Sequence, residues 1–293
     1  QNQICHLVDK LSKIAYNNTY AIFFWTHMST IEFHSHEQQD EYIYNIFNKK
    51  QNGFFLDISC GNPTIGSNSY TLEKFCGWKG IGFDILDVEA RDGWSSKRTS
   101  PFVQMDVTSP QMTEYLKANI PSDLVVDYIS LDVDAGGTSL ALQALQRVLD
   151  AGIKFKAMTF EHEYHSHGPE LRDAQRKLLE AQGMVMLFED VKGWTIGNSR
   201  HNNTEYYEDW WIHPDYFDKT LLGVKAQGLY TFECVEALRN YLNQNDYTAT
   251  HVCSRSFPEE YTLFWVSKEE ANWPYLKYQI SQLFEQYISA KAS

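Results

Sequence analysis

The chain has 293 residues, of which 43% are apolar, and its formal charge is −13. This length allows one large domain, or one α/β domain with an appendage, around an ample core. The negative charge and the lack of any run of Lys and Arg argue against a nucleic-acid partner, because a phosphate backbone needs a clustered basic surface. No apolar run reaches the roughly 18 residues of a membrane span, and the start of the chain lacks a signal-peptide pattern. We therefore expect a cytoplasmic protein with no nucleic-acid or membrane partner.

Residues 1–52 are predicted to form a helical lead-in. Apolar residues recur at helical spacing near the start of the chain, at Ile4, Leu7, Val8, Leu11 and Ile14. The same spacing returns at Tyr42, Ile43, Ile46 and Phe47. These helices are expected to cover one face of a sheet formed by the residues that follow.

Residues 53–217 alternate short apolar runs with helical patterns. Seven runs have the character of strands, at 54–58, 80–84, 102–106, 125–132, 155–161, 184–189 and 207–213. Thr108-Ser109-Pro110 is typical of a helix start, a helix is expected over 138–149, and another between Gly168-Pro169 and Gly183. This alternation predicts an α/β fold with a doubly wound, seven-stranded, mainly parallel sheet. Ligands of such sheets bind outside the carboxyl ends of the strands.

Residues 218–293 have a different pattern and are expected to form a C-terminal appendage. The pattern predicts a helix at 234–242, strands at 248–253 and 261–266, and a terminal helix at 273–288. This part can serve as one wall of an acceptor site or as the subunit interface of a homo-oligomer.

The first two predicted strands frame a candidate ligand site. A polar loop follows the first strand, and the second strand ends at Asp84. In an open α/β sheet, such a unit places a small-residue loop under the ligand and a carboxylate beside a ribose. Asp106 ends the third predicted strand and can accept from an exocyclic adenine amine, while Asp57 and the backbone of 59–62 face the middle of the ligand. A nucleoside-containing cofactor is expected. A nicotinamide-dependent oxidoreductase stays open, although the loop has only Gly61 and Gly66 in place of G-x-G-x-x-G.

Several motifs together resemble the FkbM-type family of S-adenosylmethionine-dependent methyltransferases. They are the element Ser67-Asn68-Ser69-Tyr70-Thr71-Leu72-Glu73-Lys74, the run Gly77-Trp78-Lys79-Gly80-Ile81, the run Ser130-Leu131-Asp132-Val133-Asp134, the run Phe160-Glu161-His162, and the late run Glu208-Asp209-Trp210-Trp211-Ile212-His213-Pro214. The resemblance covers about residues 54–214. It implies a class I methyltransferase fold, S-adenosylmethionine as methyl donor, and O-methylation of a sugar, glycan or small polyol-like metabolite as acceptor.

The resemblance also implies which residues bind the cofactor. They are Asp57, Ser59, Cys60, Gly61, Asn62, Asn68, Asp84, Ile85, Asp106 and Val107. Three of the loop positions depart from the family pattern, because Ser59 and Pro63 replace glycines and Ile85 stands where proline is common. A methyltransferase-fold protein that binds without catalysis is therefore the main alternative.

The acids and histidines after the fourth and fifth predicted strands are the expected catalytic group. They are Asp132, Asp134, Glu161, His162 and His165. In one mechanism Asp132, Glu161 and His162 bind a divalent cation, Mg²⁺ or Mn²⁺, that lowers the pKa of an acceptor hydroxyl. In another, His162 or His165 is a general base held by a carboxylate. In a third, Asp132 only shapes the loop by bonding to the backbone of Gly136 or Gly137. The sequence leaves these three possibilities open.

Overall fold

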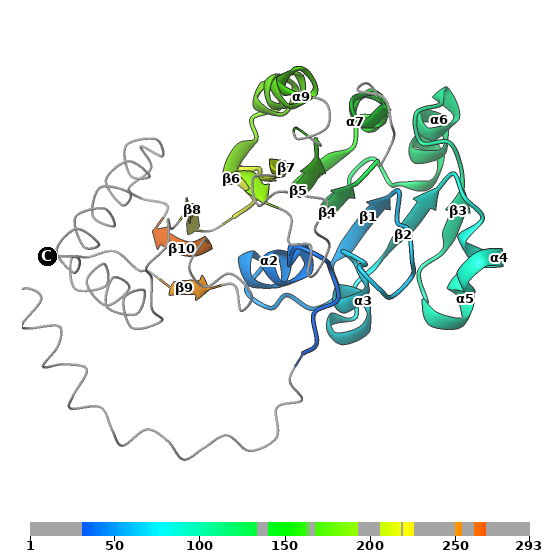
Figure 1. Ribbon diagram of the computed structural model, residues 1–293, viewed down its shortest axis with the longest axis horizontal. Helices are drawn as coiled ribbons and strands as arrows, with labels where there is room; N and C mark the ends of the chain where they lie inside the picture. The colour runs from blue at the N-terminus through cyan, green and yellow to red at the C-terminus, as the bar shows by residue number, and fades with distance from the viewer. Residues whose placement is uncertain are drawn as a thin grey trace, which may run out of the picture.

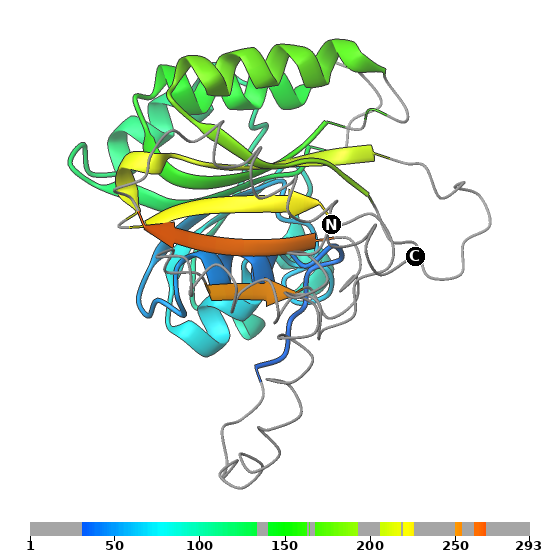
Figure 2. The ribbon, with the colours of Figure 1, turned by 90° about the vertical axis from the view of Figure 1, so that its left-hand side faces the viewer.

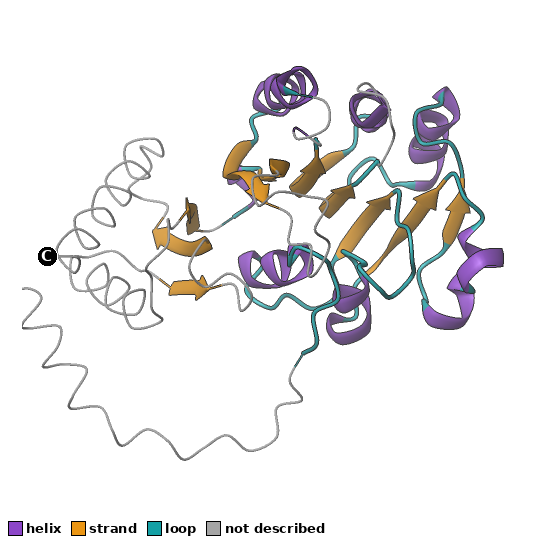
Figure 3. Cartoon of the chain, in the orientation of Figure 1, coloured by secondary structure: helices purple, strands orange, loops and turns teal. Residues whose placement is uncertain are grey.

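A computed structural model of the protein describes residues 31–133, 140–162, 164, 168–192, 206–217, 219–225, 250–253 and 261–267. It contains a seven-stranded sheet with helices on both faces, and a second sheet of three strands (Figures 1 and 3). Asp134, His165, the apolar pattern at 4–14 and the helices expected at 234–242 and 273–288 lie outside the described residues.

The seven expected strands all form, and they make one sheet. They are β1 (Phe54–Ile58), β2 (Lys79–Asp84), β3 (Phe102–Gln104), β4 (Val125–Leu131), β5 (Lys154–Glu161), β6 (Val185–Lys192) and β7 (Tyr206–Ile212). Their order is β3-β2-β1-β4-β5-β7-β6. The first five strands pair in parallel, whereas β7 is antiparallel to both β5 and β6. The predicted α/β class and mainly parallel, doubly wound sheet are confirmed. The order reverses between β1 and β4, which is where such sheets bind their ligands.

Helices cover both faces of this sheet (Figure 1). One face carries α6 (Pro110–Asn119), α7 (Leu140–Asp150) and α9 (Pro169–Ala181), and the other carries α2 (Gln39–Ile46) and α3 (Tyr70–Cys76). The short helices α4 (Val88–Asp92) and α5 (Trp94–Lys97) lie beside β3. Buried apolar residues form one cluster on each face, with Leu145 of α7 in the first and Ile43 of α2 in the second. The helix expected from Tyr42 to Phe47 is therefore present as α2 and packs as predicted.

Local signals in the sequence explain several helix ends. Pro110 and Pro169 each occupy the first turn of their helix, where the missing N–H leaves no bond unmade. Helix α3 ends at Gly77, whose φ of 64° is left-handed and suits glycine. The strand that follows therefore begins only two residues later.

The second sheet consists of β8 (Lys219–Lys225), β9 (Thr250–Cys253) and β10 (Tyr261–Ser267). Its order is β8-β10-β9, with antiparallel pairing throughout, and Figure 2 shows these strands side by side. The sequence predicts β9 and β10 but not β8. A one-turn helix, η1 (Pro214–Tyr216), separates β7 from β8. Within the described part of the chain, no helix has the length and apolar character required to cross a membrane.

Candidate functional site

The loop after β1 is held by the carboxyl end of β2. The backbone N–H of Cys60 donates to the C=O of Phe83 at 2.9 Å. The N–H of Gly61 donates to Oδ2 of Asp84 at 3.0 Å, and the N–H of Leu86 donates to Oδ1 at 2.9 Å. The Asp84 side chain is buried. An ionised carboxylate has about four lone-pair sites, so this group can still accept two more hydrogen bonds.

Two residues of this loop have left-handed backbone conformation, Ser59 with φ 65° and Gly61 with φ 57°. Glycine adopts such angles without strain, and a Cβ built on Gly61 would meet no atom within 4 Å. The backbone at Gly61 is therefore open to close approach by a ligand. Ser59 pays a steric penalty at the same kind of angle. The side-chain oxygen of Asn62 accepts from the N–H groups of Thr64 and Ile65, so Asn62 shapes the loop.

Apolar and acidic side chains lie together at the ends of β2 and β3. Ile85 and Leu86 follow Asp84 and are 64% and 53% exposed. The N–H of Met105 donates to the C=O of Asp84 at 2.8 Å, which continues the pairing one residue beyond β3. The next residue, Asp106, is exposed, and its Oδ1 accepts from the N–H and hydroxyl of Thr108. Val107 is buried in the core below. The strand ends thus place a buried acid, Asp84, and an exposed acid, Asp106, next to an exposed apolar surface.

Arg98 holds the other end of the loop, and sequence reasoning missed it. Its guanidinium is buried and donates to Glu73 at 2.9 Å, to the C=O of Pro63 at 3.0 Å and to the hydroxyl of Ser69 at 2.8 Å. It also lies over the ring of Trp94, 4.6 Å from the centroid. A buried guanidinium is retained only where several acceptors satisfy it. Arg98 therefore fixes the loop to α3 and α5.

Asp57 of β1 belongs to the same network. It is buried and accepts a hydrogen bond from Ser69. Burial raises the pKa of Asp57 to about 6, although the hydrogen bond from Ser69 and the charge of Arg98 oppose this. On the neighbouring strand, the amide of Asn68 donates to the hydroxyl of Ser130 at 2.9 Å. These contacts tie the segment before α3 to both β1 and β4.

Asp132 follows β4 and lies beside the β1 loop. Its backbone N–H donates to the C=O of Ile58 at 3.1 Å, so it is adjacent to Ser59. Its side chain is half-buried. The charge of Asp132 contributes to the raised pKa of Asp57 and also to that of Glu208.

Glu161 and Glu208 are directly opposite each other, on β5 and β7. Glu208 is buried and accepts from the side-chain amide of Gln39, at 3.2 and 3.0 Å for its two oxygens, and from the indole of Trp210. Burial raises the pKa of Glu208 to about 8, and nearby Asp132 raises it further, while the bonds from Gln39 and Trp210 lower it. Sequence reasoning gave Glu208 no role. The signal that identifies it is its position opposite Glu161 in the strand ladder.

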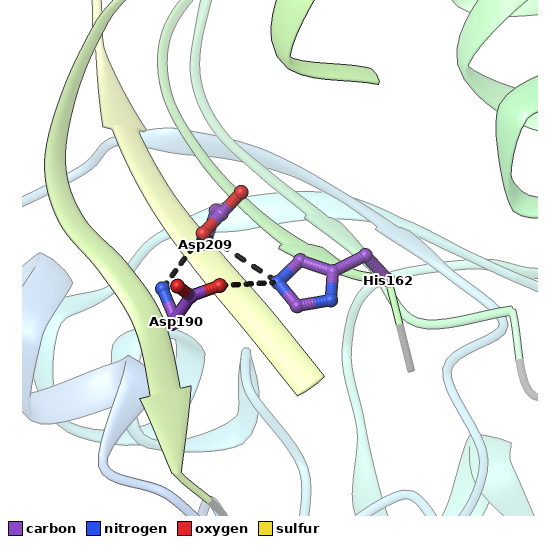
Figure 4. A group of neighbouring side chains, drawn as sticks. All are labelled: His162, Asp190 and Asp209. Carbon is purple, nitrogen blue, oxygen red and sulfur yellow. Dashed lines mark hydrogen bonds and ion pairs between the residues drawn. The ribbon is translucent and has the colours of Figure 1, made fainter. Parts of the chain in front are cut away.

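His162 lies on the other face of the sheet. Its side chain is fully buried, and its Nε2 is 3.5 Å from Asp209 and 3.9 Å from Asp190 (Figure 4). Its Nδ1 accepts the backbone N–H of Tyr164 at 3.2 Å. Glu161 is paired with Glu208, whereas His162, the residue after β5, contacts Asp209, whose side chain points to the opposite face from that of Glu208, so His162 and Glu161 diverge. The structure thus does not assemble the group of Asp132, Glu161 and His162 that the metal mechanism requires.

The two acids beside His162 are held by side chains of α9. Asp209 accepts from Nε and Nη2 of Arg176, both at 2.8 Å, and from Gln175 at 2.6 Å. Asp190 accepts from Arg176 at 2.8 Å and from Arg172 at 3.2 Å. Asp190 has a φ of 51° at an irregularity in the β6–β7 pairing, and such bulges redirect side chains. The group fastens α9 to β6 and β7.

His162, Asp190 and Asp209 each offer one potential metal ligand, all within 4.8 Å of one another. Burial alone would raise the pKa of Asp209, but the bonds from Arg176 and the nearby His162 lower it to about 2. The two carboxylates already balance two guanidinium groups, so a divalent cation would add uncompensated charge to a buried site. The donor set therefore does not fit a metal ion, and ion pairing explains it.

The sequence matches no family model and no curated protein. The structure is similar to solved methyltransferases. A candidate rRNA methylase from Clostridium thermocellum has 16% identity and a TM-score of 0.41, and the alignment covers 62% of this chain and 96% of that one. The CurJ carbon methyltransferase has 15% identity and a TM-score of 0.39, over 60% of this chain and 54% of that one. An S-adenosylmethionine-dependent methyltransferase from Anabaena variabilis has 14% identity and a TM-score of 0.37, over 60% and 85%. At these identities the likeness concerns the fold alone.

Proposed function

We propose that the chain is an S-adenosylmethionine-dependent methyltransferase that methylates an oxygen of a sugar, glycan or small polyol-like metabolite. The observation that carries the proposal is the contact between Gly61 and Asp84, which joins the carboxyl ends of β1 and β2 beside the switch point of the sheet. It places a buried carboxylate with spare acceptor capacity next to a loop whose backbone is open to a ligand. The resemblance to the FkbM-type family supports the choice of methyl donor and acceptor class.

The residues at the strand ends fit this cofactor. Asp84 would accept hydrogen bonds from the two ribose hydroxyls, and Asp106 from the adenine amine. The exposed Ile85 and Leu86 offer an apolar surface to a flat base. The backbone at Gly61 would lie against the amino-acid part of the ligand. S-adenosylmethionine, when bound, supplies a methyl group activated by a positively charged sulfur.

The chain itself must align an acceptor with that methyl group and remove the acceptor's proton. Asp132 and Glu161 are half-buried and lie at the ends of the two central strands. We assign acceptor binding and proton removal to this acidic side of the site. His162 is not included, because it is fully buried and directed toward Asp209.

Calorimetry with adenosylhomocysteine tests the cofactor assignment. Asp84→Ala should weaken binding by about 1.5–3 kcal/mol, the range for hydrogen bonds to a charged group. Asp123→Ala is the matched control, because Asp123 is exposed in the turn before β4, at the amino end of that strand and away from the carboxyl ends of the strands. Binding of a nicotinamide dinucleotide instead would favour the oxidoreductase alternative. Binding of neither ligand would leave a protein with the fold but without the activity.

Turnover tests the acceptor side. Asp132→Asn and Glu161→Gln should each lower the rate of methyl transfer by about 100-fold or more while leaving adenosylhomocysteine affinity within about threefold, as expected for interactions made in the transition state. The assays use S-adenosylmethionine with a labelled methyl group, and a panel of monosaccharides, glycans and polyols serves as acceptors. Full turnover by both variants would remove these acids from the reaction.

A further inference from the structure

The pairing of β5 with β7 brings two carboxyl groups together on the α2 side of the sheet. Directly opposite residues of an antiparallel pair have Cβ atoms about 4.5–5.5 Å apart. Glu161 and Glu208 are such a pair, and Glu208 is fixed by Gln39 and Trp210. Two negative charges at this separation repel each other, and the repulsion is strong where one of them is buried. This repulsion is removed when one of the two carboxyl groups carries a proton.

The groups around Glu208 strengthen this preference. The titratable residues that act on it come from three directions: Glu37 ahead of α2 and Asp132 after β4 add negative charge, and Tyr42 of α2 and Tyr128 of β4 are buried phenols near it. Within the described residues, no lysine or arginine forms an ion pair with Glu208. Burial, together with the charges of Asp132 and Glu37, raises the pKa of Glu208 to about 8.

A buried hydroxyl without a partner lies next to this pair. The side chain of Tyr42 is 5% exposed, and its hydroxyl makes no hydrogen bond to any described residue. Tyr42 lies on α2 three residues after Gln39 and stacks on Trp210, and both Gln39 and Trp210 donate to Glu208, so the same neighbours hold the two groups. The ring of Tyr42 stacks on Trp210 at 4.5 Å, which fixes its direction. An unpartnered buried hydroxyl costs free energy unless a ligand or water satisfies it.

We propose that Glu161, Glu208 and Tyr42 form the acceptor site, in which the two glutamates share one proton and Tyr42 binds the acceptor hydroxyl. The inference rests on the proposed methyl transfer and names the groups that take the proton. Glu161 is the half-exposed member and contacts the acceptor, so it is the catalytic residue. Glu208 acts through Glu161 and is a positioning residue.

The proton balance of the step is simple. The acceptor O–H bond breaks as its oxygen forms a bond to the methyl carbon, and the sulfur keeps the electron pair of the bond it loses. The acceptor's proton goes to the ionised carboxylate of Glu161. Glu208 keeps its own proton throughout, so the pair passes from one proton to two. Glu161 then releases its proton to solvent.

Infrared difference spectroscopy tests the shared proton without an acceptor. The wild-type protein should show the carbonyl band of a protonated carboxylic acid at pH 7, and this band should disappear as the pH rises through about 8. Glu208→Gln should remove the band, whereas Tyr42→Phe and the exposed control Glu170→Gln should retain it. A wild-type spectrum without a band that Glu208→Gln removes would overturn the proposal.

Methyl-transfer rates test the roles of the three residues. Tyr42→Phe keeps the stack on Trp210 and should raise KM for the acceptor at least fivefold. Glu208→Gln should lower kcat about tenfold. The wild-type rate should fall above pH 8, and this fall should be absent in the variant. Replacement of a purely structural residue would not change the pH profile in this way. Unchanged rates and pH profiles would refute the assignment. If the wild-type chain did not bind adenosylhomocysteine, the methyltransferase function itself would be refuted. Failure of the acceptor-site proposal and failure of the proposed function are therefore distinguishable.

Discussion

Asp84 accepts a hydrogen bond from the backbone N–H of Gly61, so the acid that ends β2 also holds the loop that follows β1. Its second oxygen accepts from Leu86. Both oxygens are therefore engaged with backbone N–H groups before any ligand binds. The carboxylate has a structural role in the free protein as well as its proposed role toward a ribose.

This double engagement predicts that Asp84→Asn destabilises the free protein. An asparagine side chain has one oxygen, and its nitrogen cannot accept from the second N–H. The free energy of unfolding should fall by about 1–3 kcal/mol, the cost of one unsatisfied buried group. Urea denaturation measures it, with Asp123→Asn as an exposed control that should change stability by less than about 0.5 kcal/mol. Equal stability of the two variants would contradict the role of Asp84 in the loop.

Ser59→Gly should stabilise the protein. Serine at φ 65° carries a steric cost of roughly 1–2 kcal/mol, while glycine in its place loses about 0.5–1 kcal/mol more backbone freedom on folding. A net gain of about 0–1.5 kcal/mol in unfolding free energy is expected. Ser59→Ala retains the Cβ and should show no gain. A loss of stability in Ser59→Gly would mean that the serine hydroxyl makes a favourable contact outweighing the strain.

Arg98→Met should be among the most destabilising changes in the loop region. It leaves Glu73 and Asp57 without the buried positive charge between them, and removal of one partner of a buried ion pair costs about 3–5 kcal/mol. Arg91→Met is the control, because Arg91 pairs with Asp92 on the surface, and such pairs contribute about 0–1 kcal/mol. Thermal denaturation of both variants compares them. Similar midpoints would show that the guanidinium of Arg98 is replaceable.

Divalent cations should leave the thermal stability unchanged, because the acids beside His162 are engaged by Arg176. A site filled at 100 times its Kd would add about 2.7 kcal/mol of stability, enough to raise the melting temperature by several degrees. Scanning fluorimetry with Mg²⁺, Mn²⁺ or Zn²⁺ should show a shift of less than about 1 °C. A larger rise that Asp209→Asn removes would establish a metal site.

The stability of the folded chain should decrease as the pH rises from about 4.5 to 8. The pKa of Glu208 is about 8 in the folded state, against an ordinary value of 4.5. At a pH between these two pKa values, unfolding therefore releases a proton from Glu208. The folded state is most favoured at the acidic end of this pH range. Asp57, with a pKa of about 6, contributes with the same sign between pH 4 and 6.

The raised pKa of Glu208 corresponds to a decrease in the free energy of unfolding on the order of 3–5 kcal/mol across this pH range. Urea denaturation of the wild type and Glu208→Gln across pH 5 to 8 measures it. The slope should be much smaller in the variant. Parallel pH profiles would show that Glu208 is ionised at neutral pH.

The sequence predicts the seven strands of the main sheet well because each is a short apolar run next to a clear helix signal. The sequence does not predict strand β8. Its sequence, Lys-Thr-Leu-Leu-Gly-Val-Lys, is strand-like only when β10 is available to pair with it. Pairing partners far along the chain are not visible in local patterns.

The candidate site was predicted in part. Asp84 and Gly61 are recognisable because the ends of adjacent parallel strands meet. Proximity in the sequence groups His162 with Glu161, although the two contact neighbouring residues of β7, Asp209 and Glu208, that point to opposite faces. Arg98 was missed because its partners, Glu73 and Ser69, are more than 20 residues away in the chain. Glu208 could be given a role only once β7 was known to lie beside β5.

The two neighbouring acids of β7 also determine how that strand can be placed. Glu208 faces Gln39 and Tyr42, where a neutral carboxyl group is favoured, whereas Asp209 faces Arg176, where only an anion satisfies the guanidinium. A shift of the strand by one residue would exchange the two sides. A shift that moved Asp209 into the place of Glu208 would put Trp210, which has no charge, beside Arg176, and Asp209, with its shorter side chain, would fall short of Gln39. Adjacent acids with opposite preferences for protonation thus specify the register of β7 between β5 and β6.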